Sequence, residues 1–126
     1  MSVPTDRRYT RDHEWFLLEG DVAKVGITAF AADALGDVVF VEPPAAGDSL
    51  TAGETCGEVE STKSVSDLLA PASGEVVEAN GAVENAPETI NQDPYGAGWI
   101  YSMSVTEEGE LLDAAEYEEL IAGEDA

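Results

Sequence analysis

The side chain of this sequence best suited to chemistry is Lys63, because its primary amine can be acylated and it is one of only two lysines in the chain. It lies within Ser61-Thr62-Lys63-Ser64, between two runs, 55–60 and 65–69, that have the alternating or apolar character of half-buried strands. Small hydroxyl residues favour a tight turn because they hydrogen-bond the local backbone. The sequence therefore predicts a β-hairpin that displays Lys63 at its tip, which suits a point of covalent attachment.

Other side chains that could do chemistry lack suitable neighbours. His13 has no cysteine or second histidine to complete a metal-ligand set, so we expect a structural role for it. Cys56 has no neighbouring base and is expected to be a small buried hydrophobic residue. Lys24 lies in a predicted strand and is expected to be an ordinary exposed residue. Glu14 and Asp67 could act as general acid and base, although a chain with 27 acidic residues contains such pairs by chance.

The length of 126 residues predicts one domain, residues 1–126, which is large enough to bury a core without disulfides or metals. A single cysteine excludes an internal disulfide and favours an intracellular location. No segment has the character of a signal peptide or the length of a membrane span, so we expect a soluble cytoplasmic protein without a membrane partner.

The net charge of −22, from 27 acidic and 5 basic residues, argues against a nucleic-acid partner, which would require a basic surface. Such self-repulsion is tolerated where salt screens it, so a halophilic source with a salt-loaded cytoplasm fits the composition. The other interpretation is an ordinary acidic protein whose charge only keeps it soluble.

Residue patterns along the chain predict strands joined by turns, with few helices. Thr28 is expected to cap a helix over 29–35 that ends at Gly36, and Asp113 with Glu116 is expected to cap a C-terminal helix that ends at Gly123. Residues 1–11 are expected to form a polar arm with little to bury. The remaining predicted features are strands at 12–18, 22–27, 37–42, 76–77 and 99–105, a turn at 71–74, a glycine turn at Gly81, a helical turn after Pro87, and an apolar face of Tyr117, Leu120 and Ile121 on the last helix.

A short internal repeat relates 36–39 to 74–77, because Gly-Asp-Val-Val is echoed by Gly-Glu-Val-Val. Two similar half-sheets flanking the lysine turn would form a flattened barrel or sandwich. Lys63 would then lie at one end, where the halves meet.

Motifs spread over nearly the whole chain resemble the glycine cleavage H proteins, a family of lipoyl carriers. These motifs are His13-Glu14-Trp15, Val25-Gly26-Ile27-Thr28, 35–42, Val59-Glu60-Ser61, Lys63, Ser66-Asp67, 73–76, Asn91, 93–96 and Gly98-Trp99. The resemblance implies a mainly β fold, a lipoyl-domain-like barrel-sandwich hybrid with short helices and a C-terminal helix.

The resemblance also implies how the protein would work. A lipoyl group would be attached by lipoylating enzymes to Lys63, removing the charge of the lysine. It would carry an aminomethyl group from glycine decarboxylase to an aminomethyltransferase, and dihydrolipoyl dehydrogenase would reoxidise its dithiol. The chain itself would be no enzyme. Glu14 and Asp67 match acidic cleft residues that hold the amine of the loaded arm in the family.

Two other functions in carrier proteins are weighed against this one. A biotinyl carrier would also present a lysine on a hairpin, but biotinyl domains flank it with methionines, whereas Thr62 and Ser64 stand here. An H-like carrier that serves lipoate relay or sulfur transfer would share the fold and the lysine. An enzyme ranks last, because the chain has no nucleophile-and-base motif and no phosphate-binding glycine loop.

If the acidic surface is an adaptation to salt, the melting temperature should climb as potassium chloride is raised from dilute to molar. At roughly 1 M salt the Debye length is only about 3 Å, so repulsion among surface carboxylates in the compact state is largely screened. Thermal unfolding followed by circular dichroism over a series of salt concentrations measures this. A flat or falling curve would leave only the interpretation of an ordinary acidic surface.

Overall fold

The fold consists of two antiparallel β-sheets of unequal size, seen in a computed structural model that describes residues 3–125. The larger sheet has six strands in the order β1-β2-β3-β9-β8-β5, and the smaller has three in the order β4-β6-β7. Their bounds are β1 Arg8–Tyr9, β2 Glu14–Glu19, β3 Val22–Ile27, β4 Val38–Glu42, β5 Ser49–Leu50, β6 Thr55–Ser61, β7 Val65–Leu69, β8 Ala72–Ala79 and β9 Tyr101–Glu108. The predicted mainly β, barrel-sandwich fold is confirmed.

Side chains from both sheets share one buried cluster, because alternate residues of each strand point inward. In the small sheet the inward row contains Val41 and Val59, each at most 3% exposed. Facing them from the large sheet are residues such as Val25, Val76 and Met103, each at most 2% exposed. Burial of apolar surface stabilises a fold by about 25 cal/mol per Å², so the side chains of this cluster make the main contribution to holding the two sheets together.

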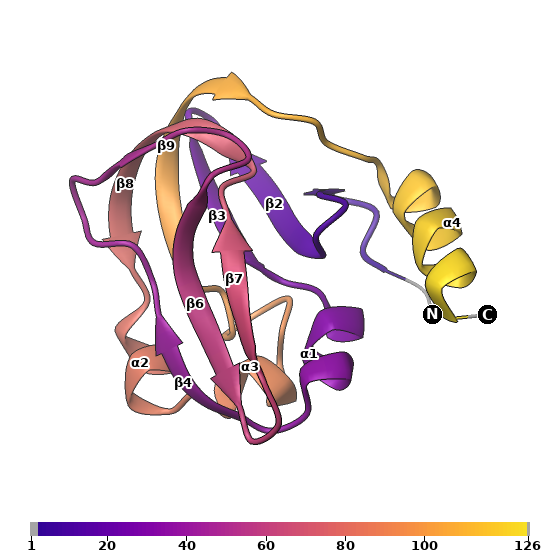
Figure 1. The fold of residues 1–126 in the computed structure, drawn as a ribbon. Coiled ribbons are helices and arrows are strands. Elements are labelled where there is room, and N and C mark those ends of the chain that lie inside the picture. The colour runs from indigo at the N-terminus through magenta and orange to yellow at the C-terminus, as the bar shows by residue number, and fades with distance from the viewer. Residues whose placement is uncertain (1–2, 126) are drawn as a thin grey trace.

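Short helices cover one end of the two sheets (Figure 1). These helices are α1 Ala29–Leu35, α2 Gly81–Asn85 and α3 Thr89–Gln92. A fourth helix, α4 Ala114–Asp125, follows the last strand. The prediction for α1 is confirmed in detail: Thr28 accepts a hydrogen bond from the amide of Ala31, and Gly36 ends the helix with φ of +82°, a conformation that favours glycine. No helix among residues 3–125 is long and apolar enough to cross a membrane.

The N-terminal segment buries more than predicted. Tyr9 in β1 is fully buried and stacks on Tyr117 of α4, with ring centroids 4.7 Å apart. The prediction of a polar arm with little to bury is therefore wrong, because the distant helix α4 supplies an aromatic partner that the local sequence does not show. The first two residues of that arm lie outside the described part of the chain.

The C-terminal helix α4 begins as predicted but ends later. Asp113 and Glu116 form the reciprocal capping pair, with side chain to backbone distances of 2.8 and 3.0 Å. Tyr117 and Ile121 are buried, as expected for its apolar face. Gly123 was expected to end the helix, but it does not adopt the positive φ of a terminating glycine, and the helix continues through it to Asp125.

Two predicted turns belong to regular elements instead. Residues 72–74 of the expected turn at 71–74 already pair with β9, where a register shift between Ser73 and Gly74 accommodates them. Gly81 was expected in a turn but is the first residue of α2, because the side chain of Asn80 caps that helix by accepting a hydrogen bond from Ala82 N. The turn signal at 71–74 was overridden by pairing with the distant strand β9, and the one at Gly81 by the helix cap of its neighbour Asn80.

The lysine hairpin is present as β6, a turn, and β7, and it lies wholly within the small sheet. The two copies of the short repeat fall in different sheets, one at β4 and the other in β8. The expected two-sheet arrangement is therefore confirmed, but the sheets are not similar halves. The β6–β7 turn lies at the same end of the molecule as α1 and α3 (Figure 1).

Candidate functional site

The turn that carries Lys63 is organised by Ser61, the last residue of β6. Its hydroxyl oxygen accepts hydrogen bonds from the amides of Lys63 and Ser64 at 3.3 and 3.1 Å, and Ser61 N donates to Ser64 O at 2.8 Å. These bonds satisfy the backbone of the turn locally. The side chain of Lys63 is exposed, as predicted.

Contacts with the segment between α1 and β4 place the turn from outside. Thr62 N donates to the carbonyl oxygen of Asp37 at 3.1 Å. The side chain of Lys63 lies over Gly36, since a methyl group added at Gly36 would be 3.0 Å from Cε and 3.8 Å from Nζ of the lysine. The lysine stem thus rests against the C-terminal end of α1.

A cleft with a volume of about 320 Å³ begins beside this lysine and runs between α1 and the edge strand β7. Apolar side chains of α1, including Ala31 and Leu35, form one wall, and Ser64 to Leu68 form the other. Lys63 is not itself a lining residue, but the next residue, Ser64, is. Glu14 lines the cleft as well, so a mostly apolar channel runs from beside Lys63 to a carboxyl group.

Glu14 is buried, with only 2% of its surface exposed. One carboxyl oxygen accepts a hydrogen bond from the Thr10 hydroxyl at 2.6 Å, and the other accepts one from Leu69 N at 3.3 Å. Loss of hydration raises the pKa of Glu14 to about 7, and the hydrogen bonds from Thr10 and Leu69 oppose that rise. Glu14 therefore exchanges a proton near neutral pH, unlike an ordinary surface glutamate.

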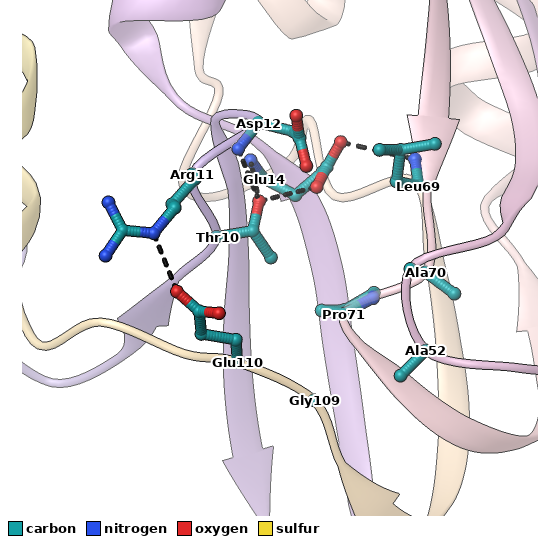
Figure 2. Close-up of a pocket in the computed structure, with 11 residues that line it drawn as sticks. Thr10, Arg11, Asp12, Glu14, Ala52, Leu69, Ala70, Pro71, Gly109 and Glu110 are labelled. Carbon is teal, nitrogen blue, oxygen red and sulfur yellow. Dashed lines mark hydrogen bonds and ion pairs between the residues drawn. The ribbon is translucent and has the colours of Figure 1, made fainter.

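A second cavity, of about 380 Å³, lies on the other side of Glu14. Figure 2 shows the carboxyl group between Thr10 and Leu69, with the exposed Arg11–Glu110 ion pair at 2.7 Å along the rim of this cavity. Glu14 lines both spaces, so it forms part of the partition between them.

Asp67 also lines the cleft, but in a different setting from Glu14. It belongs to the edge strand β7, where it is paired with Glu58 of β6, and its side chain is exposed. The structure thus places both predicted acidic residues along one cleft, one buried and one hydrated. Among residues 3–125, no group of three or more histidine, cysteine or acidic side chains could hold a metal ion.

The other candidate side chains have structural surroundings. His13 Nδ1 lies 2.8 Å from the Tyr117 hydroxyl, in line with the structural role predicted for it. Cys56 is half-buried, with Sγ 3.6 Å from the Tyr101 hydroxyl, so it is less buried than predicted. Lys24 is exposed, as predicted, with Nζ 5.3 Å from the centroid of the Trp99 ring.

Sequence reasoning gave no role to two residues that shape the site. Thr10 orients Glu14: its hydroxyl donates to the carboxyl group and accepts from Glu14 N at 3.1 Å. Asn91 forms hydrogen bonds with both Gly36 and Val38. These two residues flank Asp37, whose carbonyl oxygen accepts the hydrogen bond from Thr62 in the lysine turn. Thr10 lies four positions from Glu14, so spacing gave a weak indication, whereas the contacts of Asn91 span more than fifty residues.

Comparison with known proteins gives consistent results. The sequence model described as glycine cleavage H-protein matches residues 7–124. A glycine cleavage system H protein of Beutenbergia cavernae is 64% identical over 124 residues, covering 98% of this chain and 100% of that protein, and one of Thermobifida fusca is 53% identical over 125 residues, covering 98% and 99%. The crystal structure of a glycine cleavage system H protein from Mycobacterium marinum superposes with a TM-score of 0.90 at 55% identity, covering 98% of both chains.

The raised pKa of Glu14 predicts that its folded state holds a proton that the unfolded state releases near pH 4.5. Stability should therefore fall as pH rises from about 4.5 to about 7, by up to roughly 3 kcal/mol from this group. Glu14→Gln removes the titration, so its unfolding free energy should decline less between pH 5 and pH 8 than that of the parent.

Urea unfolding at the two pH values measures this, with Asp67→Asn as the control for loss of an exposed carboxyl group. The control should follow the parent. Equal pH dependence in the parent and in Glu14→Gln would contradict the raised pKa.

Proposed function

Because this chain belongs to the glycine cleavage H-protein family, the lipoyl carriers of the glycine cleavage system, we propose that the ε-amino group of Lys63 is where a lipoyl group is attached through an amide bond. The observation that carries the proposal is the position of Lys63, exposed on a locally bonded turn beside a mostly apolar cleft. Lys24 has no such setting, because it lies within β3 and approaches the ring of Trp99.

When attached, the group would supply a disulfide that is reduced as it takes the aminomethyl group of glycine, with the carboxyl group leaving as carbon dioxide, and a dithiol would remain for reoxidation once the aminomethyl group is passed on. In our proposal glycine decarboxylase, aminomethyltransferase and dihydrolipoyl dehydrogenase act on the group in turn, and a lipoylating enzyme installs it. Residues 1–126 act as one carrier domain in the cytoplasm and catalyse none of these steps. The core shared by both sheets supports the single domain, and the lone Cys56 supports a reducing compartment.

Glu14 and Asp67 are proposed to hold the amine of the loaded arm in the cleft. When an amine stands on a carbon bonded to sulfur, its nitrogen lone pair can expel the thiolate and form an iminium, which water converts to formaldehyde and ammonia. A protonated amine has no free lone pair and cannot follow this route. A nearby carboxylate favours the ammonium form. Both acidic residues line the cleft that begins next to the attachment turn, and this shared cleft supports the proposed role.

The burial of Glu14 gives this role a physical basis. With a pKa of about 7, the carboxyl group is readily neutral in the empty cleft, which limits the cost of burying a charge. An ammonium group entering the cleft lowers that pKa and favours the carboxylate. The apolar wall of α1 limits the access of water to the bound amine. Asp67, which remains hydrated, contributes a second negative charge at the opening.

A carrier for lipoate relay or sulfur transfer would use the same lysine, so the test must include the glycine reaction itself. Lys63→Arg keeps the positive charge but offers no primary amine, and glycine decarboxylation and exchange in a system reconstituted with the partner enzymes should disappear. Stability should change by no more than about 0.5 kcal/mol, because the turn is exposed. Lys24→Arg is the matched control and should retain full activity.

Intact mass and peptide mapping complete this experiment. The parent and the Lys24→Arg variant should each carry one lipoyl group, at Lys63. Retained glycine exchange in Lys63→Arg, or a lipoyl group found on Lys24, would rule out the attachment site.

The cleft proposal predicts that loaded protein releases ammonia faster when either acidic residue is lost. The parent, Glu14→Ala and Asp67→Ala are each lipoylated on Lys63, the lipoyl group is loaded with the aminomethyl group, and spontaneous ammonia release is followed at neutral pH. We expect release to be about tenfold faster in Glu14→Ala, and accelerated by a smaller factor in Asp67→Ala, because a hydrated charge interacts more weakly.

Glu75→Ala, which removes a carboxyl group from the surface of β8 outside the cleft, serves as the control and should release ammonia at the parent rate. Circular dichroism checks that each variant is folded. Equal release rates in all four proteins would show that these carboxyl groups do not protect the intermediate.

A further inference from the structure

Asn91 of α3 connects two backbone groups that surround the anchor of the lysine turn. Its side-chain amide donates to the carbonyl oxygen of Gly36 at 2.8 Å, and its side-chain oxygen accepts from Val38 N at 2.9 Å. Both donor and acceptor capacities of the amide are thus used on one short segment. Between these two residues lies Asp37, whose carbonyl oxygen accepts the hydrogen bond from Thr62 N at 3.1 Å.

The segment held by Asn91 also contacts the lysine itself. Gly36 adopts φ of +82° and ψ of −152°, a conformation strongly disfavoured for other residues, and the stem of Lys63 rests over it. Leu35, immediately before it, forms part of the cleft wall. Residues 35–38 therefore connect three parts of the site. They include the last cleft residue of α1 and the first residue of β4, and they contact the lysine turn.

The helix that carries Asn91 is held firmly in place. Its neighbour Ile90 is fully buried in the core. Gly98 lies so close that a methyl group there would be 2.6 Å from Asp93 O and 3.1 Å from the Cα of Ile90, and Gly98 N donates to Asp93 O at 2.8 Å. Because this helix is rigid, a side chain on it restrains the positions of the groups to which it is hydrogen-bonded.

We propose that Asn91 is a positioning residue for acyl attachment: by clamping Gly36 and Val38 it fixes Asp37, Thr62 and hence the position at which Lys63 is presented. The inference rests on the proposed function of Lys63 as the attachment site. The clamp acts from outside the hairpin, because the internal bonds of Ser61 shape the turn but do not fix it relative to the helices. An acylating enzyme must align the amine with an activated acyl group, and small displacements reduce the rate of such transfers strongly.

The experiment compares Asn91→Ala with Asn80→Ala. Asn80 is a matched control, because its amide also connects separate backbone segments: it donates to Ala97 O and Trp99 O and accepts from Ala82 N, and none of these groups contacts the lysine turn. Should Asn80→Ala fail to fold, Ser73→Ala, which removes one hydrogen bond from Ala52 N, replaces it. All proteins are compared at temperatures where unfolding curves show them fully folded.

The first readout is transfer of a lipoyl group to unmodified protein by a purified lipoate ligase with lipoate and ATP. Asn91→Ala should lower kcat/KM for modification of Lys63 about tenfold, while the control variant stays within about twofold of the parent. As a control for inhibition of the ligase, the rate at which it acylates free propylamine is measured with either variant added. This rate should be unchanged.

The second readout is amide hydrogen exchange, which does not depend on acylation. In Asn91→Ala, the backbone amide hydrogens of Val38 and Thr62 should exchange about tenfold faster or more. Those of Val59 and Val76 in the core should exchange at the parent rate. Equal losses of kcat/KM in the Asn91 and control variants, or unchanged exchange at Thr62, would overturn the positioning role. If the parent is not modified at Lys63, the proposed function fails, and the exchange data alone then decide whether the clamp exists.

Discussion

The buried carboxyl group of Glu14 is the constraint on which the site depends, because it bonds across the junction of the two sheets. It begins β2 of the large sheet and accepts a hydrogen bond from Leu69 N at the end of β7 in the small sheet. Among the described residues it is the only aspartate, glutamate, lysine or arginine that is buried. A buried carboxyl group is costly unless it is hydrogen-bonded or neutral, and Glu14 is hydrogen-bonded and has a pKa near 7. The same interaction that joins the sheets thus leaves a proton-binding group facing the cleft.

The start of β2 is fixed by a second interaction next to Glu14. Trp15 lies across Gly26 of β3 so closely that a methyl group there would be 2.7 Å from the indole ring, and its ring nitrogen donates to Pro94 O at 2.9 Å. The Arg7 guanidinium lies over the Trp15 ring, 4.7 Å from the ring centroid. These contacts hold the backbone of Glu14 from the face opposite the cleft, so the carboxyl group has little freedom to turn away from Thr10 and Leu69.

The charge of the chain and the chemistry of the cleft are separate features. The net charge of −22 arises from carboxyl groups that are nearly all hydrated, and screening by salt affects those most. Glu14 is shielded from that screening, because its surroundings are protein rather than water. The proposed attraction between Glu14 and an amine would therefore persist in salt that weakens surface interactions, including those of Asp67.

The sequence alone determined the parts of this protein that depend on neighbouring residues. These parts are the capped helix 29–35, the hairpin around Lys63 and the capping pair Asp113 and Glu116. Each depends on hydrogen bonds between residues a few positions apart, so each can be predicted from the local sequence. The family motifs in the sequence single out Lys63, Glu14 and Asp67. Local signals were misleading where a distant partner dominates: β9 pairs with residues 72–74 of a predicted turn, and α4 buries Tyr9 of a segment expected to be a polar arm.

Only the tertiary structure decided how the acidic residues differ and what holds the lysine. Glu14 and Asp67 are both carboxylic acids in the sequence, yet one is buried at the sheet junction, where loss of hydration raises its pKa, and the other is exposed on an edge strand. The contacts of Asn91 with Gly36 and Val38 join residues more than fifty positions apart, so no local pattern encodes them. Desolvation and long-range hydrogen bonding depend on the packed chain, and for that physical reason they are absent from the sequence pattern.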